Sequence, residues 1–136
     1  MRAGEPPLVI LTSNRTREVH DALKRRCLYQ WIDYPTLQKE LAIVTARVPH
    51  ASAQLAEQVT AVIHELRDME LYKAPGVSET LDWVSALTAL EQETLDADAI
   101  EQTLGVVLKA KDDIDTLRAQ GIDRLLERAR TRAARA

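Results

Sequence analysis

Asn14 is the first residue of this sequence that could take part in chemistry, because it closely follows an apolar run. Residues 8–12, LVILT, are five consecutive apolar or β-branched positions, and Ser13 and Asn14 follow them. An unbroken apolar run of this length predicts a strand buried on both faces of a parallel sheet. Ligands of open α/β sheets lie beyond the carboxyl ends of the strands, so Asn14 is expected beside a phosphate or an attacking water. The alternative is that Ser13 or Asn14 caps the next helix.

Two adjacent arginines, Arg25 and Arg26, end the short helix that should follow. We expect this helix to begin at Ser13 or Thr16 and to carry one apolar face, made by Val19, Ala22 and Leu23. The interpretation without chemistry is that the two arginines stabilise the helix: a basic side chain at a helix C-terminus interacts favourably with the helix dipole, by roughly 0.3–1 kcal/mol. A second strand, residues 28–34, is predicted next from its aromatic and β-branched content.

The sequence offers little for metal or thiol chemistry. Residues 64–68, HELRD, resemble the zinc-binding pattern HExxH, but Asp68 stands where the second histidine is required. His20 and His50 are isolated in the sequence, so we predict no metal site. Cys27 follows two arginines, which would favour a reactive thiolate, but a buried structural cysteine is the interpretation we prefer.

Composition narrows the class of protein. The chain has 136 residues, enough for one domain or a piece of one plus a small second one, and 46% are hydrophobic but only 4% aromatic. The net charge of −3 gives no global indication of nucleic acid or an anionic membrane. A single cysteine excludes an internal disulfide, and no apolar run approaches the roughly 20 residues of a membrane helix. We therefore predict a cytoplasmic protein with no membrane or nucleic-acid partner.

From Thr36 onward the hydrophobic pattern is that of helices only. The first stripe consists of Leu37, Leu41, Val44 and Val48, and Pro49 ends it. Further helices are predicted over residues 51–70, from an N-cap at Ser78, over residues 97–104 and 106–117, and after Gly121. We expect Asp112 and Asp113 to belong to a solvated helix face. The last helix ends in an arginine-rich tail that contains Arg128, Arg130, Arg132 and Arg135.

These elements predict a mostly α protein in two unequal parts. Residues 1–35 would be a piece of an α/β core with two strands and a helix, residues 36–117 an all-α bundle, and residues 118–136 a C-terminal helix with its arginine-rich tail. Two strands and one helix bury too little surface to be stable alone. The N-terminal part therefore needs neighbours that these 136 residues do not supply.

Three ordered segments, ILTSN, DALKRRC and WIDYP, resemble the second half of an AAA+ ATPase core in its MoxR family. The later run KAPGVSETLDW, residues 73–83, is similar to the CoxD-type branch, named for carbon monoxide dehydrogenase maturation. The resemblance covers about residues 6–117. It implies that the bundle is the helical lid of such an ATPase.

The resemblance also implies roles for particular residues. Asn14 matches sensor 1, which positions water near the γ-phosphate, and Arg26 matches the arginine finger offered to ATP in a neighbouring subunit, with Arg25 as the alternate. Such a finger contributes roughly 10³–10⁵ in rate. Relatives usually place a sensor-2 arginine where this chain has Thr80, in the segment that includes Ser78. Lys73 is the candidate to substitute for that arginine in binding the nucleotide.

The parts that hold ATP and Mg²⁺ are missing from the sequence. A P-loop, GxxxxGK[ST], is required, yet none of Gly4, Gly76, Gly105 and Gly121 precedes a Lys-Ser or Lys-Thr pair. An Asp-Glu pair at the end of an apolar strand is also absent. We expect ATP and Mg²⁺ to serve the full-length form only, and this chain alone neither to hydrolyse ATP nor to bind it tightly.

The functional expectation is therefore a fragment of a MoxR-type ATPase. Relatives form homo-oligomeric rings, work with partners that contain a von Willebrand factor A domain, and act as chaperones in metalloenzyme maturation. The alternative is a stand-alone helical interaction module without nucleotide chemistry. A bundle that binds nucleic acid through the arginine-rich tail is a weaker alternative, because the chain is acidic and lacks an aromatic stacking platform.

Overall fold

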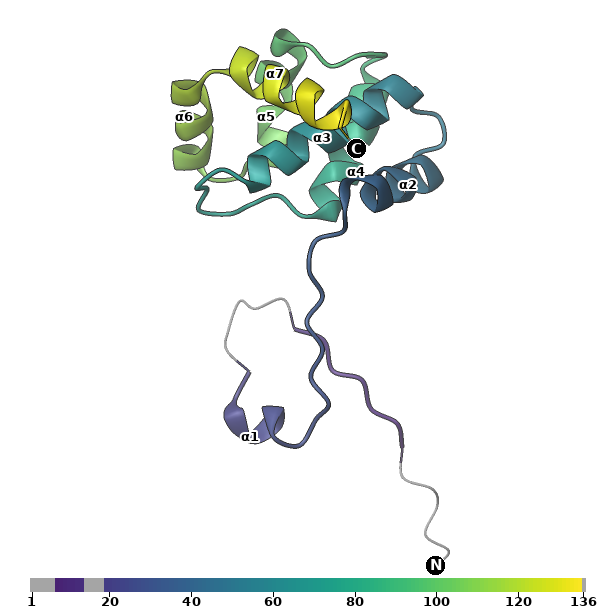
Figure 1. Ribbon diagram of the computed structural model, residues 1–136, viewed down its shortest axis with the longest axis vertical. Coiled ribbons are helices and arrows are strands. Elements are labelled where there is room, and N and C mark those ends of the chain that lie inside the picture. Colours follow the sequence, from purple (N-terminus) through teal and green to yellow (C-terminus); the bar gives the residue numbers. More distant parts are fainter. Residues whose placement is uncertain (1–6, 14–18, 136) are drawn as a thin grey trace, which may run out of the picture. The chain divides into compact units, whose positions relative to one another are not determined.

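The computed structural model of this protein describes residues 7–13 and 19–135. Across these residues the regular structure is helical, from α1 to α7 (Figure 1), and the chain divides into two units, Met1–Asp33 and Tyr34–Ala136. The mostly α fold class predicted from the sequence is confirmed. The two predicted strands are not present in the described residues.

In residues 7–13 and 19–33, the first unit contains one short helix, α1 (Asp21–Lys24). His20 caps it, because its Nδ1 atom accepts a hydrogen bond from the Ala22 amide at 3.2 Å. The helix is shorter than predicted: Val19 and His20 precede it, and the proposed starting residue Thr16 lies outside the described residues. Cys27 is exposed rather than buried, since the single turn before it provides no core to cover it.

The predicted strand segments, residues 8–12 and 28–34, carry exposed apolar side chains. Leu8 is 92% exposed, Leu28 fully exposed and Ile32 88% exposed. A strand is stable only when its backbone pairs with another strand and its side chains are covered, and the described residues supply neither. The apolar composition of these segments is therefore not sufficient to form a strand without a partner strand and a cover for the side chains.

The second unit is a bundle of six helices. They are α2 (Leu37–Arg47), α3 (Ala53–Arg67), α4 (Val77–Ala89), α5 (Ala97–Val107), α6 (Lys111–Gln120) and α7 (Ile122–Ala133). The stripe predicted for the first of these is confirmed: Val44 is buried, and Leu37, Leu41 and Val48 pack against the core. The break between α5 and α6 falls at residues 108–110, a few residues later than the sequence suggested.

Helix α3 is the centre of the bundle and packs against α2, α4 and α7 (Figure 1). Nine of its fifteen residues are buried: its large apolar side chains share one face, and Thr60, Ala61 and Glu65 are buried on its other sides. A helix with this pattern is favoured only where other helices cover it on several sides. Ser52 begins it by accepting a hydrogen bond from the Leu55 amide at 3.0 Å.

Helix α4 begins two residues earlier than an N-cap at Ser78 would require. Gly76 is the N-cap, and the Glu79 carboxylate accepts a hydrogen bond from the Gly76 amide at 2.9 Å. Further along, the buried indole of Trp83 donates a hydrogen bond to the Thr103 hydroxyl of α5 at 2.7 Å. Trp83 thus contributes a large apolar surface while its one polar atom is satisfied, which fixes the α4–α5 contact.

Asp113, in the first turn of α6, is buried instead of lying on a solvated face as predicted. Its side chain is 3% exposed and accepts hydrogen bonds from the backbone amides of Tyr72 at 2.6 Å and Lys73 at 3.2 Å. Its neighbour Asp112 is exposed, in agreement with the prediction. Asp113 therefore holds the middle of the loop between α3 and α4, residues 68–76, which is the loop before α4.

We expect Asp113→Ala to destabilise the protein by about 1–3 kcal/mol, because it leaves two backbone amides without their acceptor. Asp112→Ala is the matched control and should change the free energy of unfolding by no more than about 0.5 kcal/mol, as for other exposed positions. Urea unfolding followed by circular dichroism measures both. Equal effects of the two substitutions would contradict this role for Asp113.

Candidate functional site

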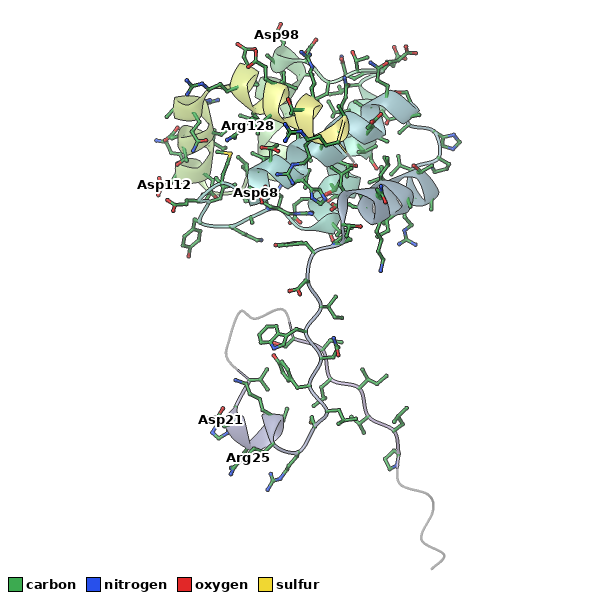
Figure 2. All side chains as sticks on the ribbon, in the orientation of Figure 1. Asp21, Arg25, Asp68, Asp98, Asp112 and Arg128 are labelled. Atoms are coloured by element: carbon green, nitrogen blue, oxygen red, sulfur yellow. The ribbon has the colours of Figure 1, made fainter. Side chains whose placement is uncertain are left out.

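The residues proposed for chemistry belong to both units. Asn14 lies outside the described residues. Arg25 and Arg26 are exposed in the first unit, where Arg25 is the C-cap residue of α1 (Figure 2). Lys73, Ser78 and Thr80 belong to the second unit. The structure gathers these last three along one loop and the first turn of α4.

Lys73 and Ser78 have exposed side chains, whereas Thr80 points into the bundle. The Thr80 hydroxyl donates a hydrogen bond to Oε1 of Glu40 at 2.6 Å, and Thr80 has no exposed surface. The loop and the first turn of α4 therefore have two sides. Lys73 and Ser78 lie on the outer side, and on the inner side Thr80 contacts the buried carboxylate of Glu40.

Glu40, in the first turn of α2, is completely buried and lies at the centre of a polar cluster. Its carboxylate accepts two hydrogen bonds from the Arg67 guanidinium, at 2.6 and 2.8 Å, in the paired geometry that Arg and carboxylates prefer. His64 Nε2 lies 2.9 Å from Oε2, and the Thr80 hydroxyl donates to Oε1, so each oxygen has two partners. Both carboxylate oxygens are thus fully used.

Arg67, the last residue of α3, extends this cluster in two further directions. Its Nε atom donates a hydrogen bond to the backbone carbonyl of Pro75 at 2.7 Å. Its guanidinium carbon lies 4.3 Å from the centre of the Tyr34 ring, at the start of the second unit. One buried side chain thus contacts the entering segment, α2 and the loop before α4.

Burial alone would raise the pKa of the Glu40 carboxyl, but the net shift is downward. The hydrogen bonds from Arg67 and Thr80 and the positive charge of Arg67 outweigh the loss of water. Glu40 is therefore ionised at neutral pH. A charged group without exposed surface is tolerated here because each of its oxygens has partners.

Burial lowers the pKa of His64, and the positive charges of Arg67 and Arg132 lower it further. The Glu40 charge and hydrogen bond raise it by less, so the net shift is downward. His64 is therefore neutral at neutral pH. Since ionised Glu40 can only accept, the neutral imidazole must carry its proton on Nε2 and donate it to Glu40.

A second ionic cluster joins α7 to α3. Arg132 Nε donates a hydrogen bond to Oε1 of Glu65 at 2.5 Å, and Arg132 also pairs with Asp68. Arg128 lies 3.4 Å from the other Glu65 oxygen. Two arginines of the tail are thus paired with carboxylates of α3 (Figure 2 labels Asp68 and Arg128), which leaves less positive charge for an anionic ligand.

In residues 7–13 and 19–135, no buried side-chain nitrogen or oxygen lacks a hydrogen-bond partner, and no group of three or more His, Cys, Asp or Glu residues is arranged to hold a metal. His64, from the HELRD segment, contacts Glu40 instead. No described helix is both long and apolar enough to span a membrane.

Sequence reasoning missed Glu40, His64, Arg67 and Asp113. A partial signal existed for Glu40, because it lies one helical turn from Leu37 and Val44 and so shares their buried face. His64 and Arg67 are three residues apart on α3 and therefore on one side of it. Glu40 of α2 contacts His64 and Arg67 of α3, which lie 24 and 27 residues later in the chain. No local sequence pattern indicates such contacts.

No protein-family model, curated protein or solved structure matches this chain.

Because the folded-state pKa values of His64 and Glu40 are both lowered, acid should destabilise the protein in two steps. The unfolded chain protonates its histidine first, so stability begins to fall as pH drops below about 6.5, the ordinary pKa of histidine. A second loss begins below about 4.3, the ordinary pKa of glutamate, and continues as pH falls through the lowered value of Glu40. Urea unfolding at a series of pH values measures both steps.

His64→Gln should remove the first step and leave the second. His50→Gln, at an exposed position, is the matched control and should keep both steps. If the wild type and His64→Gln lose stability in parallel between pH 7 and pH 5.5, the charge assignment of His64 is wrong.

Proposed function

We propose that this chain is the C-terminal portion of a MoxR-type AAA+ ATPase of the CoxD-type branch. In this proposal residues 8–35 complete the α/β core of the ATPase, and the helices that follow form its lid. The longer protein binds ATP and Mg²⁺, assembles into a homo-oligomeric ring in the cytoplasm, and acts as a chaperone in metalloenzyme maturation. A protein with a von Willebrand factor A domain is its proposed partner.

The observation that carries the proposal is the contrast between the two units. The second unit buries most of its large apolar side chains, whereas Leu8, Ile10, Leu28 and Ile32 are each more than 80% exposed in the first. Burying one such side chain is worth about 1.5–3 kcal/mol, so a chain that leaves several in water forgoes considerable stability. Segments with this composition are suited to the interior of a sheet, and the remainder of an ATPase core would supply that sheet.

The proposal assigns the strand conformation of residues 8–12 and 28–34 to the completed core. Both segments would gain backbone partners and cover for their side chains at the same time, which is what strand formation requires. Asn14 would then lie at the carboxyl end of the first strand, as sensor 1. Arg25 and Arg26 are exposed, which leaves them available to a neighbouring subunit.

For the nucleotide-facing side of the lid we assign Lys73 and Ser78, whose side chains are exposed at the loop and first turn of α4. Thr80 takes a different role in this proposal. Its hydroxyl is held by Glu40, so it would support the loop from below rather than contact a phosphate. The lid would thus bind nucleotide without a sensor-2 arginine at that position.

A stand-alone interaction module is the second candidate. The same exposed apolar segments favour it, since extended apolar residues also bind partner proteins by adding a strand to a sheet edge. The two candidates differ in the reading frame ahead of Met1. An encoded P-loop and an Asp-Glu strand there support the ATPase, and their absence from the transcript supports the module.

In the longer protein, Arg26→Ala should lower ATP turnover by roughly 10³–10⁵-fold with little change in nucleotide affinity, because an arginine finger acts on the transition state. Arg47→Ala, at an exposed position at the end of α2, is the matched control and should leave turnover intact. Steady-state phosphate release and nucleotide titration measure the two quantities.

Mixed rings separate a finger from a purely structural arginine. A subunit without its P-loop lysine but with Arg26 should restore activity to Arg26→Ala subunits, since the two defects lie at different interfaces. Wild-type turnover in the pure Arg26→Ala ring, with no effect of mixing, would remove Arg26 from the proposal and leave Arg25 to be tested.

A further inference from the structure

The loop before α4 is held at two places by different side chains. Asp113 of α6 binds the amides of Tyr72 and Lys73 in its middle. Arg67 binds the carbonyl of Pro75 near its end, 2.7 Å from Nε. Removing one attachment therefore leaves the other in place, and the part of the loop next to α4 depends on Arg67.

Arg67 is itself placed by contacts on three sides. Glu40 holds both terminal nitrogens, Pro75 accepts from Nε, and the Tyr34 ring lies against the face of the guanidinium at 4.3 Å. The guanidinium is planar and its donors have a fixed geometry, so it cannot tilt to follow Tyr34 and keep all its hydrogen bonds. The Arg67 side chain is 7% exposed, so water does not readily replace a lost contact.

We propose that Arg67 couples the segment entering the bundle at Tyr34 to the loop that opens α4. A displacement of Tyr34 shifts the guanidinium and thereby loosens Pro75, Gly76 and the first turn of α4. Arg67 is in this sense a positioning residue for the surface that carries Lys73 and Ser78. The inference rests on the proposed function only for the ligand that this surface would face.

The consequence for regulation follows from the place of Tyr34 in the chain. Tyr34 immediately follows the last residue of the first unit, Asp33. Any event that pulls on the connection, such as completion of a core or engagement of a neighbour by the first unit, reaches Tyr34 first. The loop before α4 then loosens even though no ligand has bound to it or left it.

Tyr34→Leu tests this coupling without leaving a buried charge unpaired, because Tyr34 is half exposed and Arg67 keeps its hydrogen bonds to Glu40. We expect the exchange of the Gly76 and Thr80 amides with deuterium to become about two- to fivefold faster, the range that a partly exposed cation–π contact predicts. Tyr34→Phe keeps the aromatic face and should retain the wild-type rates. The whole chain is used, and two-dimensional NMR resolves the individual amides.

The amide of Ile100, bonded within α5, serves as the internal reference for general unfolding. Tyr29→Leu, an aromatic substitution in the first unit, is the second control and should leave Gly76 unchanged. Unchanged exchange at Gly76 in Tyr34→Leu, or equal acceleration at Gly76 and Ile100, would overturn the coupling. The measurement needs no nucleotide, so it is independent of the Arg26 experiment: loss of the arginine-finger role would leave this result standing, and the reverse also holds.

Discussion

A single carboxylate, that of Glu40, determines how three helices and a loop meet. It is removed from water entirely, which is unfavourable for a charge unless other groups replace the lost solvation. Arg67, His64 and Thr80 provide that replacement from α3 and α4. Because their positions are tied to one another through Glu40, none of these elements can shift without exposing or orphaning a buried charge.

The same arrangement recurs elsewhere in the second unit. Asp113 of α6 holds the middle of the loop before α4, and Glu65 of α3 holds α7 through Arg132. In each case a carboxylate that is at least nine-tenths buried fixes a segment that apolar packing alone would leave free to slide. Leu, Ile and Val side chains provide most of the stability of this bundle, and the buried carboxylates select one arrangement of its parts.

The helices of the second unit were predictable because their signals are local. Stripes such as Leu37, Leu41, Val44 and Val48 repeat with the helical period, and their burial follows from it. The boundaries were less accurate. At Gly76 the carboxylate of Glu79 accepts a hydrogen bond from the backbone amide, and this contact favours Gly76 over the better intrinsic N-cap Ser78.

The first unit shows the limit of the same reasoning. Residues 8–12 have the composition of a buried strand, but a strand depends on partners distant in sequence, and here the described residues offer none. Cys27 was expected to be buried on the assumption of a core around it, and it is exposed. The proposed site was predictable only in part: the exposure of Lys73 followed from its loop, whereas the inward direction of Thr80 depends on Glu40, 40 residues earlier.

The central claim is that the Glu40–Arg67 pair positions the loop before α4 rather than adding net stability. Replacing both partners with apolar residues of similar size, Glu40→Leu with Arg67→Met, tests it most directly in a urea-unfolding and amide-exchange experiment. Each single change should cost about 3–5 kcal/mol, because it leaves one buried charge unpaired, while the double change should restore stability to near the wild-type value. The Gly76 amide should nevertheless exchange faster in the double variant than in the wild type. A double variant that is as unstable as the sum of the single changes, or one in which Gly76 keeps its full protection, would contradict the account.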